Sequence, residues 1–314
     1  MRAKPLRAIG VVLRAGLALL TLGLCAGAWA LAFTPHPLPG ADGTPLQAIV
    51  RGPLAPPERF RVAVIPGSGC AGMGTVAERY FAGLLHARVL VLHKRTVAAD
   101  ATTAPADCGA DFVRHDALAP WLADAQAALA AWQRELASPP LPLVLVGISE
   151  GAELLPALAA RLHPAALVLV GSSGLDPAQA GRLQAERLGE RAAWDELARA
   201  QAGAADDVSV VQGRSLRYWR DFWHWPVQVL LLTGPWPLLQ IWGEDDALVP
   251  QAAYRHFEAL AQGRAAPYCV VRLPGADHGL QAPGHDGVQW LWARLERWAR
   301  APERGWCSVF TESP

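Results

Sequence analysis

Short runs of β-branched and leucine residues alternate with helical segments along most of the chain, and this alternation constrains its fold most strongly. The runs cover residues 61–65, 88–92, 143–146, 166–170, 238–242 and 268–273. Helices are expected at residues 73–85, 116–136, 152–162, 251–262 and 285–300. Strands separated by such helices form βαβ units. The sequence therefore predicts an α/β fold, with a mostly parallel central sheet and helices on both faces.

The strand–helix alternation is interrupted once, between residues 175 and 235. We expect residues 61–314 to form the main domain, with a helical cap inserted at about 175–235. Open α/β sheets bind ligands at the carboxyl ends of their strands, and the cap is expected to lie there. Residues 34–60 are rich in proline and are expected to form a linker with a short strand at 47–51.

The expected cap contains an aromatic segment, Tyr-Trp-Arg-Asp-Phe-Trp-His-Trp-Pro, at residues 218–226. Aromatic side chains suit the wall of an apolar substrate pocket. They also suit the packing of a cap onto the domain beneath it. The sequence supports both interpretations equally.

The first 33 residues are typical of an export or anchoring segment. Arg2, Lys4 and Arg7 precede an apolar stretch at residues 9–33, which only Arg14 interrupts. This pattern fits a cleaved signal peptide, and it also fits an uncleaved membrane anchor with membrane contact through residues 8–33. Both alternatives predict an exported protein, in a bacterial periplasm, either soluble or held at the inner membrane.

Four cysteines follow that segment: Cys70, Cys108, Cys269 and Cys307. An even number of cysteines in an oxidising compartment indicates two disulfides. Pairing cysteines that are nearest in sequence gives Cys70–Cys108 and Cys269–Cys307, although three connectivities are open. The spacing lacks the C-x-x-C pairs typical of zinc sites.

The formal charge is zero, with 28 basic and 28 acidic residues. A nucleic-acid-binding protein needs an excess of Lys or Arg to neutralise phosphates, so nucleic acid is not expected as a partner. Only two of the basic residues, Lys4 and Lys94, are lysines.

The residues that carry chemistry follow the expected strands directly. Gly147–Gly151 reads Gly-Ile-Ser-Glu-Gly, a G-x-S-x-G pattern between the strand at 143–146 and a helix. A sharp strand-to-helix turn of this kind places the hydroxyl of the central serine above the sheet, and glycine fits where backbone segments approach closely. Ser149 is therefore the candidate nucleophile.

A serine hydroxyl needs a base, and the base needs a carboxylate to orient it. His278 lies in the loop after the last expected strand, from which a side chain can reach back over the strand ends. Glu244, Asp245 and Asp246 follow the strand at 238–242, and their spacing alone does not separate them.

This chain order of strand, nucleophile, acid and histidine resembles that of the α/β-hydrolase family. The family's acid loop often reads G-x-x-D-x-x-V-P, which matches Gly243, Asp246, Val249 and Pro250. The resemblance implies that Asp246 is the acid, with Asp245 as the second choice.

The same resemblance implies an oxyanion hole made by the backbone N–H groups of Glu150 and Ser68, with Gly69 as the second choice in place of Ser68. This chain has Pro66 where many members of the family have histidine, so the match of the second loop is partial.

The resemblance implies a serine hydrolase that acts on a small-molecule or lipid-like acyl substrate and needs no cofactor and no metal. Esterase or thioesterase activity is expected first, and peptidase and acyltransferase activities stay open. The alternative is a non-catalytic protein of the same fold that binds or assembles in the cell envelope. The direction of the Glu150 side chain, into the site or away from it, also stays open.

Overall fold

The computed structural model describes residues 32–136 and 140–311. The signal or anchor prediction for residues 1–33 therefore falls almost entirely outside the described residues. Within the described ranges, none of the helices has both the length and the apolar character needed to span a membrane.

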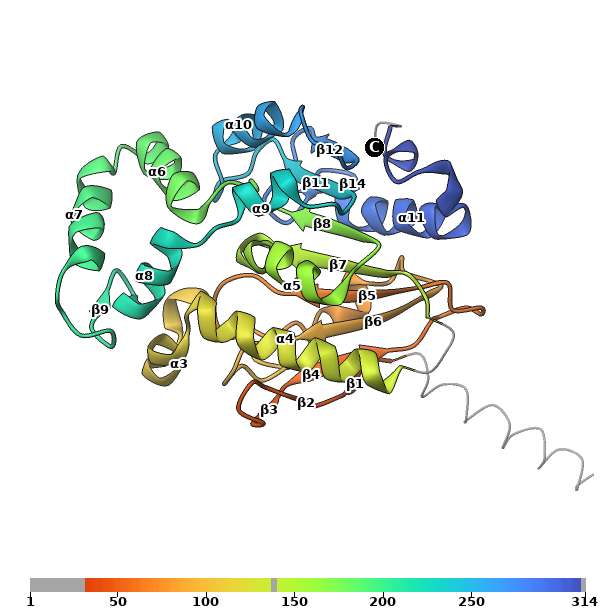
Figure 1. The fold of residues 1–314 in the computed structure, drawn as a ribbon, viewed down its shortest axis with the longest axis horizontal. Helices are drawn as coiled ribbons and strands as arrows, with labels where there is room; N and C mark the ends of the chain where they lie inside the picture. The colour runs from red at the N-terminus through yellow and green to blue at the C-terminus, as the bar shows by residue number, and fades with distance from the viewer. Residues whose placement is uncertain (1–31, 137–139, 312–314) are drawn as a thin grey trace, which may run out of the picture.

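An eight-stranded sheet forms the centre of the molecule, in the order β1-β4-β6-β5-β7-β8-β11-β12 (Figure 1). The strands from β6 to β12 are parallel, and β4 and β1 extend one edge in antiparallel fashion. Their bounds are β1 Thr34–Pro35, β4 Ala48–Arg51, β5 Phe60–Ile65, β6 Ala87–Leu92, β7 Leu143–Ile148, β8 Ala166–Val170, β11 Leu238–Gly243 and β12 Tyr268–Leu273. The fold class is as the sequence predicts.

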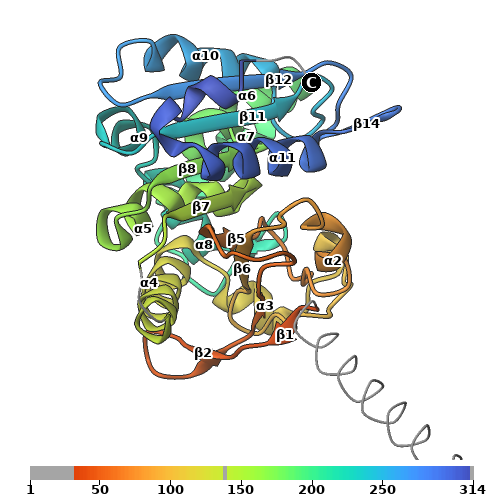
Figure 2. The same cartoon turned by 90° about the vertical axis from the view of Figure 1, so that its right-hand side faces the viewer.

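Helices cover both faces of this sheet (Figure 2). One side carries α4, α5, α9 and α10, and the other carries α2 and α11. Their bounds are α2 Ala77–Tyr80, α4 Leu118–Glu135, α5 Leu155–Leu162, α9 Gln228–Thr233, α10 Gln251–Ala261 and α11 Gly287–Arg300. The short helix α3 (Ala110–His115) precedes α4.

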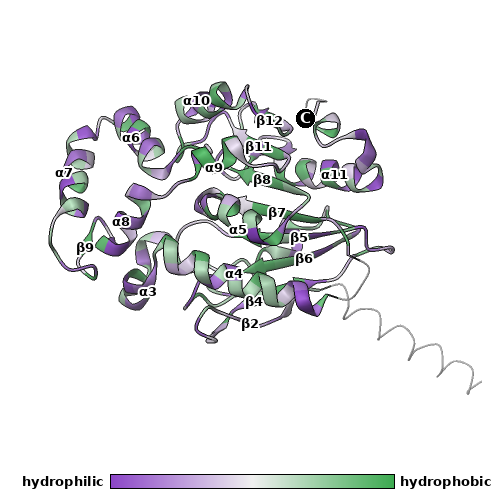
Figure 3. Ribbon diagram, in the orientation of Figure 1, coloured by the Kyte–Doolittle hydropathy of each residue, from purple (hydrophilic) through white to green (hydrophobic). Residues whose placement is uncertain are grey.

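Alternation along each strand divides the core into two layers. In β7, Val144 and Val146 pack on the side of α2 and α11, whereas Leu143 and Leu145 pack on the side of α4 and α5. The same division of valine from leucine holds in β6 and, with Ala166 among the valines, in β8. Because successive side chains point to opposite faces, a strand that is buried on both faces consists mostly of apolar residues. Figure 3 shows these strands as the hydrophobic centre of the molecule.

Between β8 and β11 the chain forms the helices α6 (Pro177–Leu188), α7 (Arg191–Ala202) and α8 (Leu216–His224), followed by α9. The strands β9 (Val210–Val211) and β10 (Arg214–Ser215) form a small hairpin before α8. We refer to residues 175–235 as the cap. The helices α6 and α7 are separate because Gly189, between them, has a φ of 74° and turns the chain.

The remaining strands form two further hairpins. These pair β2 (Leu38–Pro39) with β3 (Pro45–Leu46) and β13 (Gln281–Ala282) with β14 (His285–Asp286). Residues 34–60 therefore contribute β1 to β4, and β4 is a strand of the main sheet. Four 3₁₀ helices complete the described elements: η1 Pro105–Asp107, η2 Ser149–Leu154, η3 Pro302–Arg304 and η4 Cys307–Val309.

The helix expected at residues 73–85 is wrong in length, since α2 spans only Ala77–Tyr80. The backbone carbonyls that would continue a helix accept hydrogen bonds from other elements instead. Arg51 donates to the carbonyl oxygens of Phe81 and Leu84, and Trp292 donates to that of Tyr80. The segment is therefore held by tertiary contacts, which no local pattern reveals.

Two disulfides join Cys70 to Cys108 and Cys269 to Cys307. This is the pairing predicted from the order of the cysteines. The first disulfide fastens the loop after β5 to the segment before α3, and the second fastens η4 to β12.

Candidate functional site

Ser149 lies on a sharp turn at the end of β7 and has a φ of 52°, in the left-handed region that is costly for a residue with a Cβ. The flanking glycines allow this turn. A Cβ atom at Gly147 would lie 2.3 Å from Ala152 Cα, and one at Gly151 would lie 2.1 Å from the carbonyl oxygen of Ile65. The strand, turn and helix thus approach so closely that only glycine fits at either position.

The loop after β5 lies beside this turn. A Cβ atom at Gly67 would lie 3.2 Å from Ser149 Cβ, so the loop passes close to the turn. Ser68 follows Gly67 and lines the same cavity as Ser149 and Glu150. Within the described part of the chain, the N–H group of Ser68 has no hydrogen-bond acceptor. It is thus available to a substrate oxygen.

Asp246 and His278 form a hydrogen-bonded pair. His278 Nδ1 lies 2.8 Å from Asp246 Oδ2, and Tyr254 donates to the same oxygen at 2.7 Å. The backbone N–H groups of Leu248 and Val249 donate to the other oxygen, Oδ1, at 2.7 and 2.9 Å. Burial raises the pKa of Asp246, but the hydrogen bonds from His278, Val249 and Tyr254 outweigh it and hold the pKa below the ordinary 3.8. Asp246 is therefore a carboxylate at neutral pH.

The imidazole of His278 lies over the strand next to Ser149. A Cβ atom at Gly171 would be 3.0 Å from His278 Cε1. Gly171 directly follows β8, and Ile148 of β7 is in register with Val170 of β8. Ser149 and Gly171 thus continue two strands that run about 4.8 Å apart. In the described part of the chain, the hydroxyl of Ser149 makes no hydrogen bond.

The structure brings Asp246 and His278 together and places the imidazole near Gly171, at the end of the strand next to that of Ser149. Asp245, the second choice for the acid, is exposed and does not contact the imidazole. Ser68 and Glu150, the predicted oxyanion donors, line the same cavity as Ser149.

The carboxylate of Glu150 points away from solvent, into a buried group of charges. Lys94 donates to its Oε1 and, at 2.8 Å, to Asp116 Oδ1. Tyr218 donates to its Oε2 at 2.6 Å. Burial raises the pKa of Glu150, but the charges of Lys94 and Arg214 outweigh it, so the pKa is lowered and the side chain is ionised.

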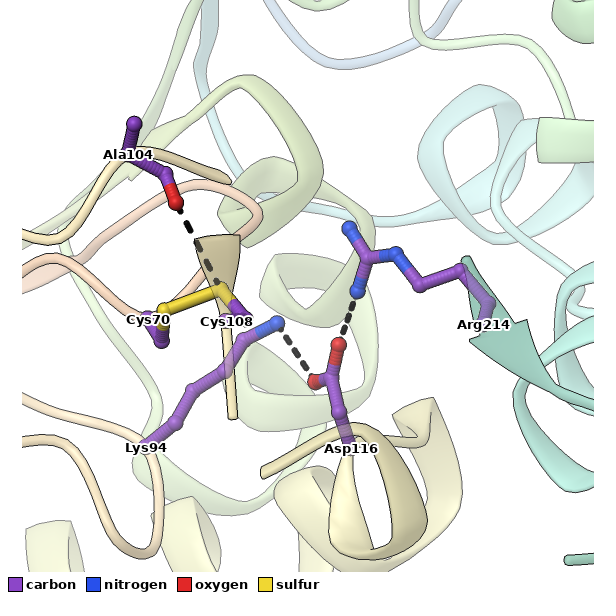
Figure 4. Close-up of a disulfide and its surroundings, with 6 residues drawn as sticks. All are labelled: Cys70, Lys94, Ala104, Cys108, Asp116 and Arg214. Carbon is purple, nitrogen blue, oxygen red and sulfur yellow. Dashed lines mark hydrogen bonds and ion pairs between the residues drawn. A yellow bond between two sulfur atoms is a disulfide. The ribbon is translucent and has the colours of Figure 1, made fainter. Parts of the chain in front are cut away.

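Arg214 completes this group, which we call the charge cluster: Lys94, Asp116, Glu150, Arg214 and Tyr218. Arg214 donates to Asp116, lies 4.0 Å from Glu150 and has its guanidinium carbon 4.4 Å from the centre of the Tyr218 ring. Figure 4 shows Lys94 and Arg214 reaching Asp116 from two sides, next to the Cys70–Cys108 disulfide. Two cations and two anions balance, as burial of charge requires.

The charge cluster joins the cap to the sheet domain. Lys94 and Asp116 belong to loops of the sheet domain, and Glu150 follows the candidate nucleophile. Arg214 and Tyr218 belong to β10 and α8 of the cap. Glu150 is therefore held by side chains from both the sheet domain and the cap.

A cavity of about 220 Å³ lies between Ser149 and the cap. Its apolar walls include Phe222, Leu248 and Val249, and its polar walls are Ser68, Ser149, Glu150, Glu153, Gln184, Arg214 and Tyr218. A second cavity, of about 670 Å³, is lined by the loop that carries Asp245 and Asp246. Ser149 does not line this cavity.

The aromatic segment of the cap serves mainly to pack the cap. Trp223 stacks on Trp194 with ring centres 4.6 Å apart, and Trp225 donates from its ring N–H to the carbonyl oxygen of Glu153. Of the segment, only Tyr218 and Phe222 line the cavity. Both sequence interpretations therefore apply, each to different rings.

Sequence reasoning missed the charge cluster and the hydroxyl of Tyr254 beside Asp246. One signal was present for Lys94, which is one of only two lysines among 28 basic residues. A lysine in a chain that otherwise uses arginine is a sign that a compact ammonium group is needed.

Across the described ranges, no three His, Cys, Asp or Glu side chains gather closely enough to hold a metal ion.

Comparison with known proteins finds likeness at the level of structure. The chain matches no family model, and no curated protein matches it. Among solved structures, Est1E from Butyrivibrio proteoclasticus with ferulic acid bound has a TM-score of 0.62 at 17% identity, over 85% of this chain and 99% of that one.

Two further structures are similar. The esterase domain of a Rhodothermus marinus protein has a TM-score of 0.54 at 16% identity, over 86% of this chain and 98% of that one. An alpha-beta serine hydrolase homologue from Coxiella burnetii has a TM-score of 0.52 at 14% identity, over 84% and 98%. Likeness at such low identity shows a shared fold.

Proposed function

From the premise that this chain has the α/β-hydrolase fold, we propose that it is a serine hydrolase that cleaves an ester, thioester or amide bond. The observation that carries the proposal is the placement of the Asp246–His278 pair over Gly171, on the strand next to the strained turn of Ser149. Ser149 is the proposed nucleophile, His278 the base and Asp246 the orienting acid.

In the proposed reaction, Nε2 of His278 accepts the proton of the Ser149 hydroxyl as its oxygen attacks the carbonyl carbon of the substrate. The hydrogen bond from Nδ1–H to Asp246 fixes the tautomer that leaves Nε2 free to accept. His278 then donates this proton to the leaving group, and an acyl-enzyme forms at Ser149. Water, deprotonated by His278, hydrolyses the acyl-enzyme and restores the serine.

The negative charge on the former carbonyl oxygen needs donors that are already in place. The backbone N–H groups of Ser68 and Glu150 are the proposed donors. Both residues line the cavity beside Ser149. The charge cluster fixes Glu150 through its side chain, which supports the position of its N–H group.

The proposed substrate is a small molecule or a lipid-like compound with an acyl group that enters the cavity under the cap. Esterase or thioesterase activity is proposed first, since two of the similar structures are described as an esterase domain and a serine hydrolase homologue, and Est1E binds ferulic acid. Neither the proposed reaction nor its residues require a cofactor.

We also propose that the protein is exported to an oxidising compartment. The basic and apolar start of the chain supports this proposal, as do the two disulfides.

Covalent labelling tests the proposed function. A fluorescent fluorophosphonate should label the folded protein, and Ser149→Ala should abolish the labelling. Ser68→Ala is the matched control, because it removes a hydroxyl near the site but keeps the backbone N–H group, so its labelling should persist. Folded wild-type protein that takes up no label would favour the non-catalytic alternative, a binding or assembly protein of the cell envelope.

A further inference from the structure

Glu153 is a second acidic side chain beside the candidate nucleophile. It lies on η2, one turn after Ser149, and lines the same cavity. The ring N–H of Trp225, from the cap, donates to its backbone carbonyl oxygen at 3.0 Å. Sheet domain and cap therefore both fix the backbone from which the Glu153 side chain extends.

The carboxyl group of Glu153 lacks a partner in the described part of the chain. Its Oε2 atom is buried and makes no hydrogen bond there. The contrast with Glu150, one turn earlier, is sharp, since Lys94 and Tyr218 both donate to that carboxylate. Buried polar atoms in folded proteins nearly always have a hydrogen-bond partner, so an exception at the wall of a cavity points to a partner that arrives with a ligand.

The surroundings of Glu153 disfavour a negative charge. Burial raises its pKa well above the ordinary value, and the charge of Glu150 raises it further, against the opposing effects of Lys94 and Arg214. Those two cations are already paired with Asp116 and Glu150. These surroundings favour the protonated form of Glu153, and a carboxylic acid can both donate and accept a hydrogen bond.

We propose that Glu153 selects the substrate by hydrogen-bonding an uncharged polar group, such as a hydroxyl or a carbonyl, in the part of the substrate that fills the cavity. Among the other walls, Phe222, Leu248 and Val249 offer apolar surface to a short carbon chain, and the charge of Arg214 is already paired with Asp116. The substrate class is thus a compact acyl compound with one uncharged polar substituent. This inference rests on the proposed hydrolase function and deepens it.

The test compares p-nitrophenyl esters that differ in one group. The series contains the butyrate and hexanoate, their 3-hydroxy counterparts, the 6-hydroxyhexanoate, and an ester with a trimethylammonium group in the acyl chain. The readout is the ratio of kcat/KM for each substituted ester to that of its unsubstituted parent. For the wild-type enzyme we expect at least one hydroxy ester to be preferred by about tenfold or more, since a buried partner left unpaired by the parent is costly.

Two variants identify the group responsible. Glu153→Gln keeps an uncharged side chain of the same shape that donates and accepts, so it should retain most of the preference. Glu153→Leu cannot hydrogen-bond and should reduce the ratio to about one, while the parent esters are still hydrolysed. The fold of both variants is checked by fluorophosphonate labelling.

The outcomes separate the two proposals. Hydrolysis of the parent esters with no preference for any hydroxy ester would overturn the role of Glu153 and leave the hydrolase function standing. A preference for the trimethylammonium ester that both variants lose would also overturn it, because Glu153 would then act as an anion. Absence of both hydrolysis and labelling in the wild-type protein would overturn the two proposals together.

Discussion

The hydroxyl of Tyr218 lies 2.6 Å from Oε2 of Glu150. Tyr218 belongs to α8 of the cap, and Glu150 directly follows Ser149 at the end of β7. The contact therefore ties the position of a proposed oxyanion donor to the seating of the cap. A change in the cap can reach the proposed chemistry through this one bond, without any change in the residues that react.

Tyr218→Phe removes this hydrogen bond and leaves a buried carboxylate oxygen without its nearest donor. We expect the free energy of unfolding to fall by about 2 kcal/mol, and kcat to fall severalfold with little change in KM. Urea unfolding and steady-state kinetics measure the two effects. Tyr80→Phe is the control, since the hydroxyl of Tyr80 makes no hydrogen bond in the described part of the chain. If Tyr218→Phe had the same kcat as the wild type, the contact between the cap and Glu150 would not support the oxyanion hole.

Lys94→Met should be among the most destabilising single changes in the chain. It leaves Asp116 and Glu150 with only Arg214 to balance them, and removing one partner of a buried ion pair costs on the order of 3–5 kcal/mol. Adding Glu150→Gln restores the charge balance, so the double variant should lose less than the sum of the two single losses.

The control for Lys94 is Arg182→Met, which breaks a surface pair with Glu186. That change should cost about 0.5 kcal/mol or less. Additive losses in the Lys94 and Glu150 double variant would contradict the view that the cluster acts as one charge-balanced unit.

Asp246→Asn tests the acid and its pH dependence. The folded-state pKa of Asp246 lies below 3.8, so its ionised form stabilises the fold fully above that pH, and the stabilisation is lost as pH falls through the lower, folded-state value. The difference in unfolding free energy between wild type and variant should thus be largest near neutral pH and shrink below 3.8. The groups facing this carboxylate are His278, Tyr254 and two backbone N–H groups.

Turnover by Asp246→Asn should fall by on the order of 10⁴, because the histidine loses the acceptor that sets its tautomer. Asp245→Asn, at the exposed neighbouring carboxylate, should leave turnover and stability unchanged. The reverse result would transfer the role of the acid to Asp245.

The two disulfides provide a matched pair, since both span 38 residues. Loop-closure entropy then predicts the same loss of stability, about 4 kcal/mol, when either is replaced by two alanines. Cys70 lies two residues after Ser68, however, so Cys70→Ala/Cys108→Ala should also lower kcat/KM. Cys269→Ala/Cys307→Ala should not. Equal turnover in the two double variants would show that the first disulfide does not support the loop beside Ser149.

The buried strands were predictable because strands covered on both faces appear as apolar runs, as in β7 and β8 and in β5 and β6 after their second residue. Their order also placed Ser149, Asp246 and His278 at strand ends. The two-residue strands were not predictable, because a pair such as Thr34–Pro35 is too short to show a pattern. Nor was the shortness of α2, which depends on hydrogen bonds from Arg51 and Trp292.

The charge cluster is the clearest example of a feature that could not be predicted from the sequence. Lys94 and Asp116 are 22 residues apart, and Asp116 and Arg214 are 98 residues apart. No spacing rule links residues that come from separate loops and from an inserted segment. The direction of Glu150 stayed open for the same reason, because its partners are defined only by the folded chain.

The insertion point of the cap has an evolutionary consequence. The cap leaves the sheet after β8 and returns at β11, and these two strands are neighbours. Another segment could be grafted there while every strand pairing is preserved, which makes the region a natural place for substrate range to diversify. Replacement of the cap is constrained at one point, because Arg214 belongs to the charge cluster. Without Arg214, the cluster keeps one positive charge on Lys94 and two negative charges on Asp116 and Glu150. Any replacement must bring a cation of its own to the same spot, so chimeras lacking one should misfold even when their helices fit.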